Sequence, residues 1–175
     1  MCKLRLNCLG RILGKPGIAM LGGLLLLGFS DAMAGAAPVN DNFANAISLN
    51  AVGPLQGTIT GSNVGATKET GEPIAANSGG GKSIWYKWTA TFTGTMDFNT
   101  EGSSFDTVLG IYTGTAVANL QLVAQNDDVA FPQDLTSDTQ FPVTQGAVYF
   151  ILVDGHEGDS GSVVLRHWLV SMVRT

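Results

Sequence analysis

Short runs of β-branched and aromatic residues recur along the chain from Ser83 onward, and Gly, Asp and Asn separate one run from the next. Several runs alternate between apolar and polar positions, which is the pattern of a strand with one buried face. The earlier run Leu55–Thr60 is also predicted to be a short strand. The pattern therefore predicts eight strands, at Leu55–Thr60, Ser83–Thr91, Thr95–Thr100, Thr107–Thr113, Leu120–Gln125, Thr139–Thr144, Val148–Asp154 and Ser162–Trp168.

Two of these runs, Val108–Tyr112 and Val148–Val153, carry hydrophobic residues at successive positions. Strands with two apolar faces are typical of the centre of a two-layer packing. From residue 35 onward no stretch shows a sustained helical spacing of apolar residues, so helices should be minor. The expected fold is all-β, an antiparallel two-sheet β-sandwich of jelly-roll type with about eight strands.

Residues 1–34 have the features of a signal peptide. Basic residues precede the apolar run Gly17–Phe29, and Ala32-Met33-Ala34 follows it as a cleavage signal. The alternative is an uncleaved anchor, but the run is shorter than the roughly 20 residues that a spanning helix needs. Both cysteines, Cys2 and Cys8, precede the apolar run, so the mature chain contains none. An exported chain without disulfides indicates a bacterial secreted protein.

Removal of residues 1–34 leaves 141 of the 175 residues, which is enough for one domain. We expect a lead-in segment over 35–54, the sandwich over 55–170 and a short tail over 171–175.

The lead-in segment and the loop after the first expected strand lie outside the strand pattern. In the lead-in segment, Asn42–Leu49 predicts a single helical turn that Asp41 caps and that turns Phe43, Ala46 and Ile47 inward. The loop Gly61–Lys82 is long for a compact domain, which indicates either a functional or a mobile segment.

The mature chain is acidic, with 5 Lys and Arg against 13 Asp and Glu once the four basic residues and the one acidic residue of the signal peptide are removed. A surface with a net charge of −8 repels phosphate backbones and anionic lipid headgroups. This balance argues against nucleic-acid and membrane partners. Cations, neutral glycans and proteins remain as partner classes.

Several blocks occur in an order that resembles the bacterial pre-peptidase C-terminal family and its close relatives. The blocks are NDNFANAISL, GSNVGATKETGEP, GKSIWYKWTA, GSSFDTVLGIYTG, VAQNDD and YFILVDG, which span about Asn40 to Leu165. The resemblance implies a non-catalytic β-sandwich of the kind found on secreted bacterial proteins, often beside a peptidase or in tandem. Some domains of that family bind calcium. This chain departs from that setting because it has no room for a peptidase and contains one copy.

Two motifs imitate catalytic loops. The segment Gly158–Ser162 resembles the nucleophile loop of chymotrypsin-like proteases, but His156 lies too close to Ser160 in sequence to match the base of that family. We expect a polar hairpin turn there. The segment Gly79–Ser83 resembles the end of a phosphate-binding loop, yet a strand pattern follows it where that motif requires a helix. We expect a flexible loop that leads into a strand.

Aromatic residues in the run after Ser83 suggest a surface for sugar rings. Within a strand, Ile84, Tyr86 and Trp88 share one face, which we assign to the core. Trp85 and Lys87 share the other face, and the lysine indicates that this face is half exposed. Trp85 is therefore a candidate ligand contact, with ordinary burial as the alternative.

Carboxylates collect at expected strand ends and turns in the second half of the chain. Asp127 and Asp128 form the best nucleus, and Asp106 and Asp154 end neighbouring strands, so these four residues are candidate ligands for Ca²⁺. The spacing does not match an EF-hand loop. The alternative is a turn whose aspartates bond their own backbone. No other cofactor is expected.

The signal peptide predicts a secreted, periplasmic or cell-surface protein. The absence of a complete catalytic set predicts that it is not an enzyme. We expect a binding, adhesion or accessory module whose partner is a protein or a glycan. A glycan-binding module with exposed aromatic residues is the first alternative, and a hydrolase is a distant one.

Overall fold

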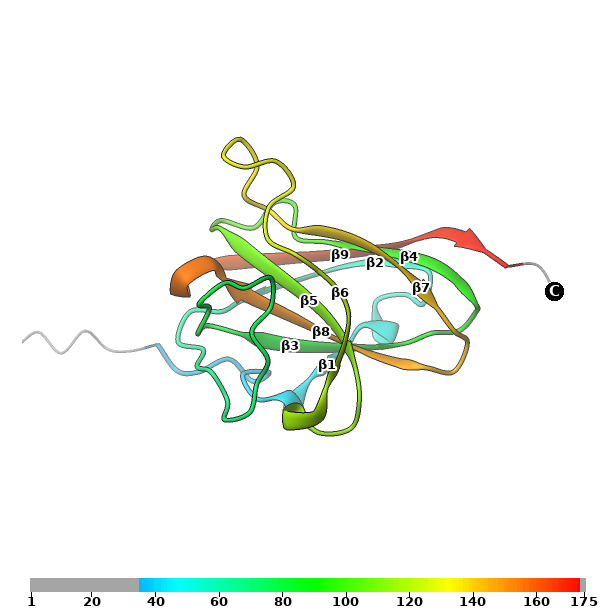
Figure 1. Ribbon diagram of the computed structural model, residues 1–175, viewed down its shortest axis with the longest axis horizontal. Helices are drawn as coiled ribbons and strands as arrows, with labels where there is room; N and C mark the ends of the chain where they lie inside the picture. Colours follow the sequence, from blue (N-terminus) through cyan, green and yellow to red (C-terminus); the bar gives the residue numbers. More distant parts are fainter. Residues whose placement is uncertain (1–34, 174–175) are drawn as a thin grey trace, which may run out of the picture. The chain divides into compact units, whose positions relative to one another are not determined.

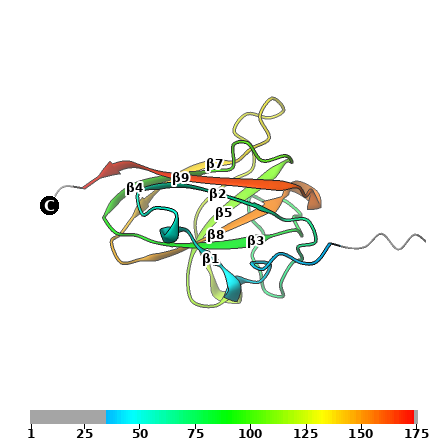
Figure 2. The same cartoon turned by 180° about the vertical axis from the view of Figure 1, so that it is seen from behind.

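The computed structural model describes residues 35–173, which form two packed sheets (Figures 1 and 2). The five-stranded sheet has the order β1 (Ile47–Ser48), β3 (Ile84–Thr89), β8 (Val148–Gly155), β5 (Thr107–Thr113), β6 (Gln121–Asn126). The four-stranded sheet has the order β2 (Gln56–Ser62), β9 (Ser162–Met172), β4 (Gly94–Asn99), β7 (Asp138–Val143). The expected all-β sandwich is confirmed.

The strand orders β3-β8-β5-β6 and β2-β9-β4-β7 are those of a jelly roll. Consecutive strands mostly alternate between the two sheets, and β5 and β6 form the hairpin within one sheet. All neighbours pair antiparallel except β1, which runs parallel to β3 with Ile47 opposite Tyr86. The two most apolar runs, β5 and β8, lie side by side inside the five-stranded sheet, as expected.

All eight expected strands are present, and β5 has the expected bounds. The additional strand β1 is two residues long, too short to show a period of two in the sequence. Strand β9 continues to Met172, so it includes the first two residues of the segment expected as a tail. Four short 3₁₀ helices complete the described chain: η1 (Phe43–Asn45), η2 (Leu49–Ala51), η3 (Val117–Asn119) and η4 (His156–Gly158).

The main core lies between the sheets and is rich in aromatic side chains. Trp88 is fully buried, and its ring centroid lies 6.1 Å from that of Phe98. Phe98 in turn lies 5.6 Å from Phe141 of the next strand. Ile84 and Tyr86 join the same cluster, which confirms the face that the sequence assigned to the core.

A second apolar cluster covers the outer face of the five-stranded sheet. Trp85 has 0% exposure there, with Phe43 packed edge-on against its ring at 5.3 Å and Tyr112 at 6.0 Å. The lead-in segment therefore packs on the domain, as expected. The expectation that Trp85 is half exposed is wrong, because this segment and the loop before β3 cover it. A sugar ring has no access to the buried indole.

The lead-in segment is attached by hydrogen bonds of a kind that its sequence did not predict. Asp41 does not cap the helical turn; its carboxylate accepts hydrogen bonds from the backbone N–H and the Oγ1 of Thr67, at 2.6 and 2.9 Å. Asn42 occupies the N-cap position of η1 without a side-chain bond. The Nδ2 of Asn40 donates to the carbonyl of Trp85 at 2.9 Å. These bonds join the segment to the long loop and to β3.

The expected signal peptide lies outside the described residues. Between residues 35 and 173 the structure contains no helix with the length and apolar character that crossing a membrane requires.

Candidate functional site

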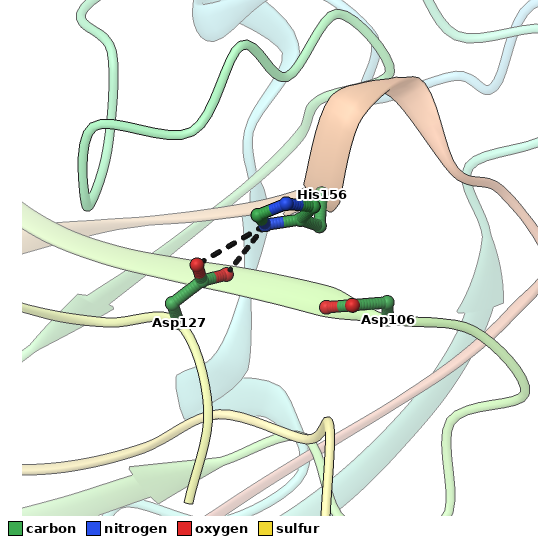
Figure 3. Close-up of side chains that lie close together, drawn as sticks. All are labelled: Asp106, Asp127 and His156. Carbon is green, nitrogen blue, oxygen red and sulfur yellow. Dashed lines mark hydrogen bonds and ion pairs between the residues drawn. The ribbon is translucent and has the colours of Figure 1, made fainter. Parts of the chain in front are cut away.

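Strand pairing brings Asp106, Asp127 and His156 together at one end of the sandwich (Figure 3). Asp106 immediately precedes β5 and His156 immediately follows β8; these strands are antiparallel, with Thr107 opposite Gly155. The backbone N–H of His156 donates to the carbonyl of Asp106 at 2.9 Å. Asp127 follows β6, the other neighbour of β5. One ligand atom from each of the three residues lies within 4.8 Å of the others.

His156 and Asp127 form an ion pair at the centre of this cluster. The Nδ1 of His156 lies 3.2 and 3.1 Å from the two carboxylate oxygens of Asp127. The hydrogen bond that Asp127 accepts from the imidazole raises the pKa of His156. Since both side chains are partly exposed, the pair contributes little to the stability of the fold.

Asp106 and Asp128 add two further carboxylates, each with one oxygen that has no hydrogen-bond partner among residues 35–173. Loss of hydration raises the pKa of both side chains, and repulsion between neighbouring carboxylates raises it further. The Oδ1 atoms of both are buried and have no hydrogen-bond partner among residues 35–173. Such oxygens are the kind of acceptor that a cation or an external donor satisfies.

Asp154, the fourth predicted ligand, does not join the cluster. Its Oδ1 accepts hydrogen bonds from the backbone N–H groups of Gly81, Lys82 and Gly155 at 3.1, 2.8 and 2.8 Å. Lys68 Nζ lies 4.0 Å from its Oδ2. Asp154 therefore anchors the loop before β3. The glycine-rich segment is a loop leading into a strand, as expected, and the anion that its N–H groups bind is the protein's own carboxylate.

The donor set is two carboxylates, Asp106 and Asp127, with one imidazole, which differs from the predicted set. Calcium takes six to eight oxygen ligands, whereas an imidazole nitrogen suits zinc and related ions. His156 belongs to the set because β5 and β8 pair, a relationship that joins residues about 50 positions apart. The sequence identifies His156 as a candidate ligand only once these two strands have been paired.

The protease-like motif does not assemble a catalytic set in the described chain. His156 is bound to Asp127, and between residues 35 and 173 no hydroxyl or thiol group is hydrogen-bonded to its ring. The segment Gly158–Ser162 links β8 of one sheet to β9 of the other, so it is not the expected hairpin turn. The carbonyl of Asp159 accepts a bond from Asn63, and the N–H of Gly161 donates to that side chain. These contacts give the motif a structural role.

Beside the cluster, residues 127–137, hereafter the β6–β7 loop, project beyond both sheets (Figure 1, yellow). Phe131 near its tip is 75% exposed, and Val129 is also exposed. The base is firmly attached, since the buried Ser137 donates to the carbonyls of Thr107 and Asp127 at 2.7 and 2.8 Å. The sequence did not single out Phe131, because one aromatic residue between strands shows no periodicity.

No family model matches the chain, and no curated protein matches it. A solved structure that matches is the crystal structure of Aeromonas hydrophila PliG, a periplasmic lysozyme inhibitor of g-type lysozyme. The match covers 71% of this chain and 95% of that chain, with 18% sequence identity and a TM-score of 0.47.

Proposed function

We propose that this protein is a secreted, non-catalytic binding module that docks on another protein through its β6–β7 loop. The observation that supports the proposal is the exposed side chain of Phe131 on a projecting loop with a firmly bonded base. Aromatic anchors that enter a partner's pocket carry much of the energy of protein interfaces. A prearranged loop loses little conformational entropy on binding.

The charge around the loop supports a basic partner. Asp106, Asp127 and Asp128 lie at its base, and the expected mature chain has a net charge of −8. Opposite charge on a partner accelerates association and favours the correct orientation. The proposed partner is therefore a basic protein with an apolar pocket that accepts a benzyl side chain.

The proposal includes export of the protein and a relationship to a known domain family. The basic and apolar pattern of residues 1–34 supports export to the periplasm or the cell surface. The blocks from about Asn40 to Leu165 support a relationship to pre-peptidase C-terminal domains. A cation that stabilises the acidic end is supported by the unpartnered oxygens of Asp106 and Asp128.

The test is binding of the processed chain to purified basic proteins with open clefts, a g-type lysozyme among them, measured by surface plasmon resonance. We expect saturable binding that weakens with salt and that Phe131→Asp reduces at least about tenfold. Val39→Asp is the matched control, because Val39 is equally exposed but lies in the lead-in segment. Binding to none of the proteins, or equal binding by wild type and Phe131→Asp, would refute the proposal.

A further inference from the structure

The outer face of the four-stranded sheet carries polar side chains around one exposed tryptophan. On β9, Leu165 and His167 point into the sandwich, so Arg166 and Trp168 lie on the outer face. Strand register places Trp168 between Gln56 of β2 and Asp97 of β4, and Gln140 of β7 follows in the same row. The next row contains Thr58, Arg166, Asn99 and Asp138.

Trp168 differs from the other two tryptophans of the sequence. Trp85 and Trp88 have 0% exposure, whereas Trp168 is 37% exposed. An indole that is partly exposed on a polar sheet offers a flat apolar surface to a ligand and an N–H donor at its edge.

A shallow depression of about 420 Å³ lies beside Trp168, over β2 and β9. Gln56, Thr58 and Arg166 contribute polar side chains to its lining, which also includes Val52. Arg166 forms an ion pair with Glu101, and both side chains are exposed to solvent. The depression thus combines one aromatic surface with charged and neutral hydrogen-bonding groups.

Asp97, next to Trp168 in the same row, is a second observation that suggests a functional role for this face. Its side chain is only 1% exposed, and its Oδ1 has no hydrogen-bond partner among the described residues. Burial raises its pKa to about 6. A buried carboxylate with an unsatisfied oxygen costs stability, and such groups concentrate at functional sites.

We propose that this face binds a neutral oligosaccharide, with one sugar ring stacked on Trp168 and its hydroxyl groups bonded to Gln56, Thr58 and Arg166. A pyranose ring has a face of C–H groups and an edge of hydroxyl groups, which match an indole plane flanked by polar side chains. The acidic chain disfavours polyanionic sugars. The site is separate from the β6–β7 loop and does not depend on the protein-binding function proposed above.

Fluorescence provides a direct test, because Trp168 is the exposed member of the three tryptophans. The processed chain is titrated with cellohexaose, chitohexaose and maltohexaose while emission and acrylamide quenching are recorded. We expect one of these sugars to shift the emission to shorter wavelength and to protect Trp168 from quenching, with saturation. Absence of a saturable change with all three would overturn the proposal.

Variants connect the signal to the site, with affinity measured by calorimetry so that the readout does not need Trp168. We expect Trp168→Ala to weaken binding at least about tenfold, Gln56→Ala to weaken it a few-fold, and Trp168→Phe to retain part of the affinity. Val148→Ala, an exposed apolar position on the other sheet, and Phe131→Asp should bind as the wild type does. Unchanged affinity in folded Trp168→Ala would refute the site. If the alanine variant does not fold, unchanged affinity in Trp168→Phe would refute it instead.

Discussion

The Nδ1 of His156 lies 3.1 Å from the Oδ2 of Asp127, and this contact joins the end of β8 to the end of β6, the two strands that flank β5. The pair occupies part of the set of atoms that a cation would use. Any ion that binds here must therefore compete with an existing internal bond.

This competition predicts an order of metal preference. We expect Zn²⁺ to raise the melting temperature more than Ca²⁺ at equal concentration, because an imidazole nitrogen is a good ligand for Zn²⁺ and calcium prefers oxygen. A hundredfold excess over Kd adds about 2.7 kcal/mol, a shift on the order of 5 °C for a domain of this size. The measurement is differential scanning fluorimetry with Zn²⁺, Ca²⁺, Mg²⁺ and chelator. Asp106→Asn and His156→Ala should remove the zinc effect; a larger effect of calcium would favour the all-oxygen set predicted from the sequence.

Asp97 predicts a specific dependence of stability on pH. Its pKa is about 6 in the folded protein, against an ordinary value of 3.8 for an aspartate in water, so the folded state binds the proton more tightly. Stability is then greatest below the unfolded pKa and falls as pH rises towards the folded pKa. We expect Asp97→Asn to match the wild type near pH 3.5 and to exceed it by about 1 to 3 kcal/mol above pH 7. Urea unfolding across this range measures the difference.

Asp134 serves as a control, because its pKa is shifted in the opposite direction to that of Asp97. Its carboxylate accepts hydrogen bonds from the N–H and the Oγ1 of Thr136, at 3.0 and 2.7 Å, and these bonds lower its pKa. The stability that it contributes is present above the unfolded pKa and is lost as pH falls through the folded pKa. Asp134→Asn should therefore lose stability at neutral pH and match the wild type in acid. The Asp97 interpretation fails if both variants change with pH in the same direction.

The two tryptophans with different exposure should differ in their effect on folding. Trp85→Ala removes a fully buried ring from the cluster with Phe43 and Tyr112, and we expect a loss of about 3 to 5 kcal/mol. Trp168→Ala should cost less than Trp85→Ala, because the Trp168 ring is partly in solvent. Urea denaturation of both variants, followed by circular dichroism, makes the comparison. Similar losses would mean that Trp168 has a structural role.

Removal of the Asp154 carboxylate should release the loop before β3. Asp154→Ala leaves the N–H groups of Gly81 and Lys82 without their acceptor, and each buried donor without a partner costs about 1 to 3 kcal/mol. We expect faster hydrogen exchange at these two amides, measured by nuclear magnetic resonance. Asp154→Asn keeps one acceptor oxygen and should show a smaller change. An unaltered exchange rate in the alanine variant would show that other contacts hold the loop.

The sequence predicted the strands because their alternation and turn residues are local signals, and it predicted the jelly roll from their number and spacing. It did not predict the environment of Trp85, since Phe43, which covers it, lies 42 residues earlier and packs only after the chain folds back. The same limit explains why the sequence did not predict that His156 joins the cluster or that Asp154 binds the loop before β3. Alternation identifies the face of a strand on which a residue lies, whereas the partner of a turn carboxylate depends on strand pairing.

Pairing of β2 with β9 has a consequence for the order of events in synthesis. Gly61 lies opposite Val163, so the four-stranded sheet cannot close until nearly the whole described chain is available. Contacts this distant in sequence form slowly, because a large loop must close before they become favourable. A nascent chain that lacks β9 therefore leaves β2 without its partner strand and the four-stranded sheet incomplete. The export proposed above would then act on a chain in which this sheet has not yet formed.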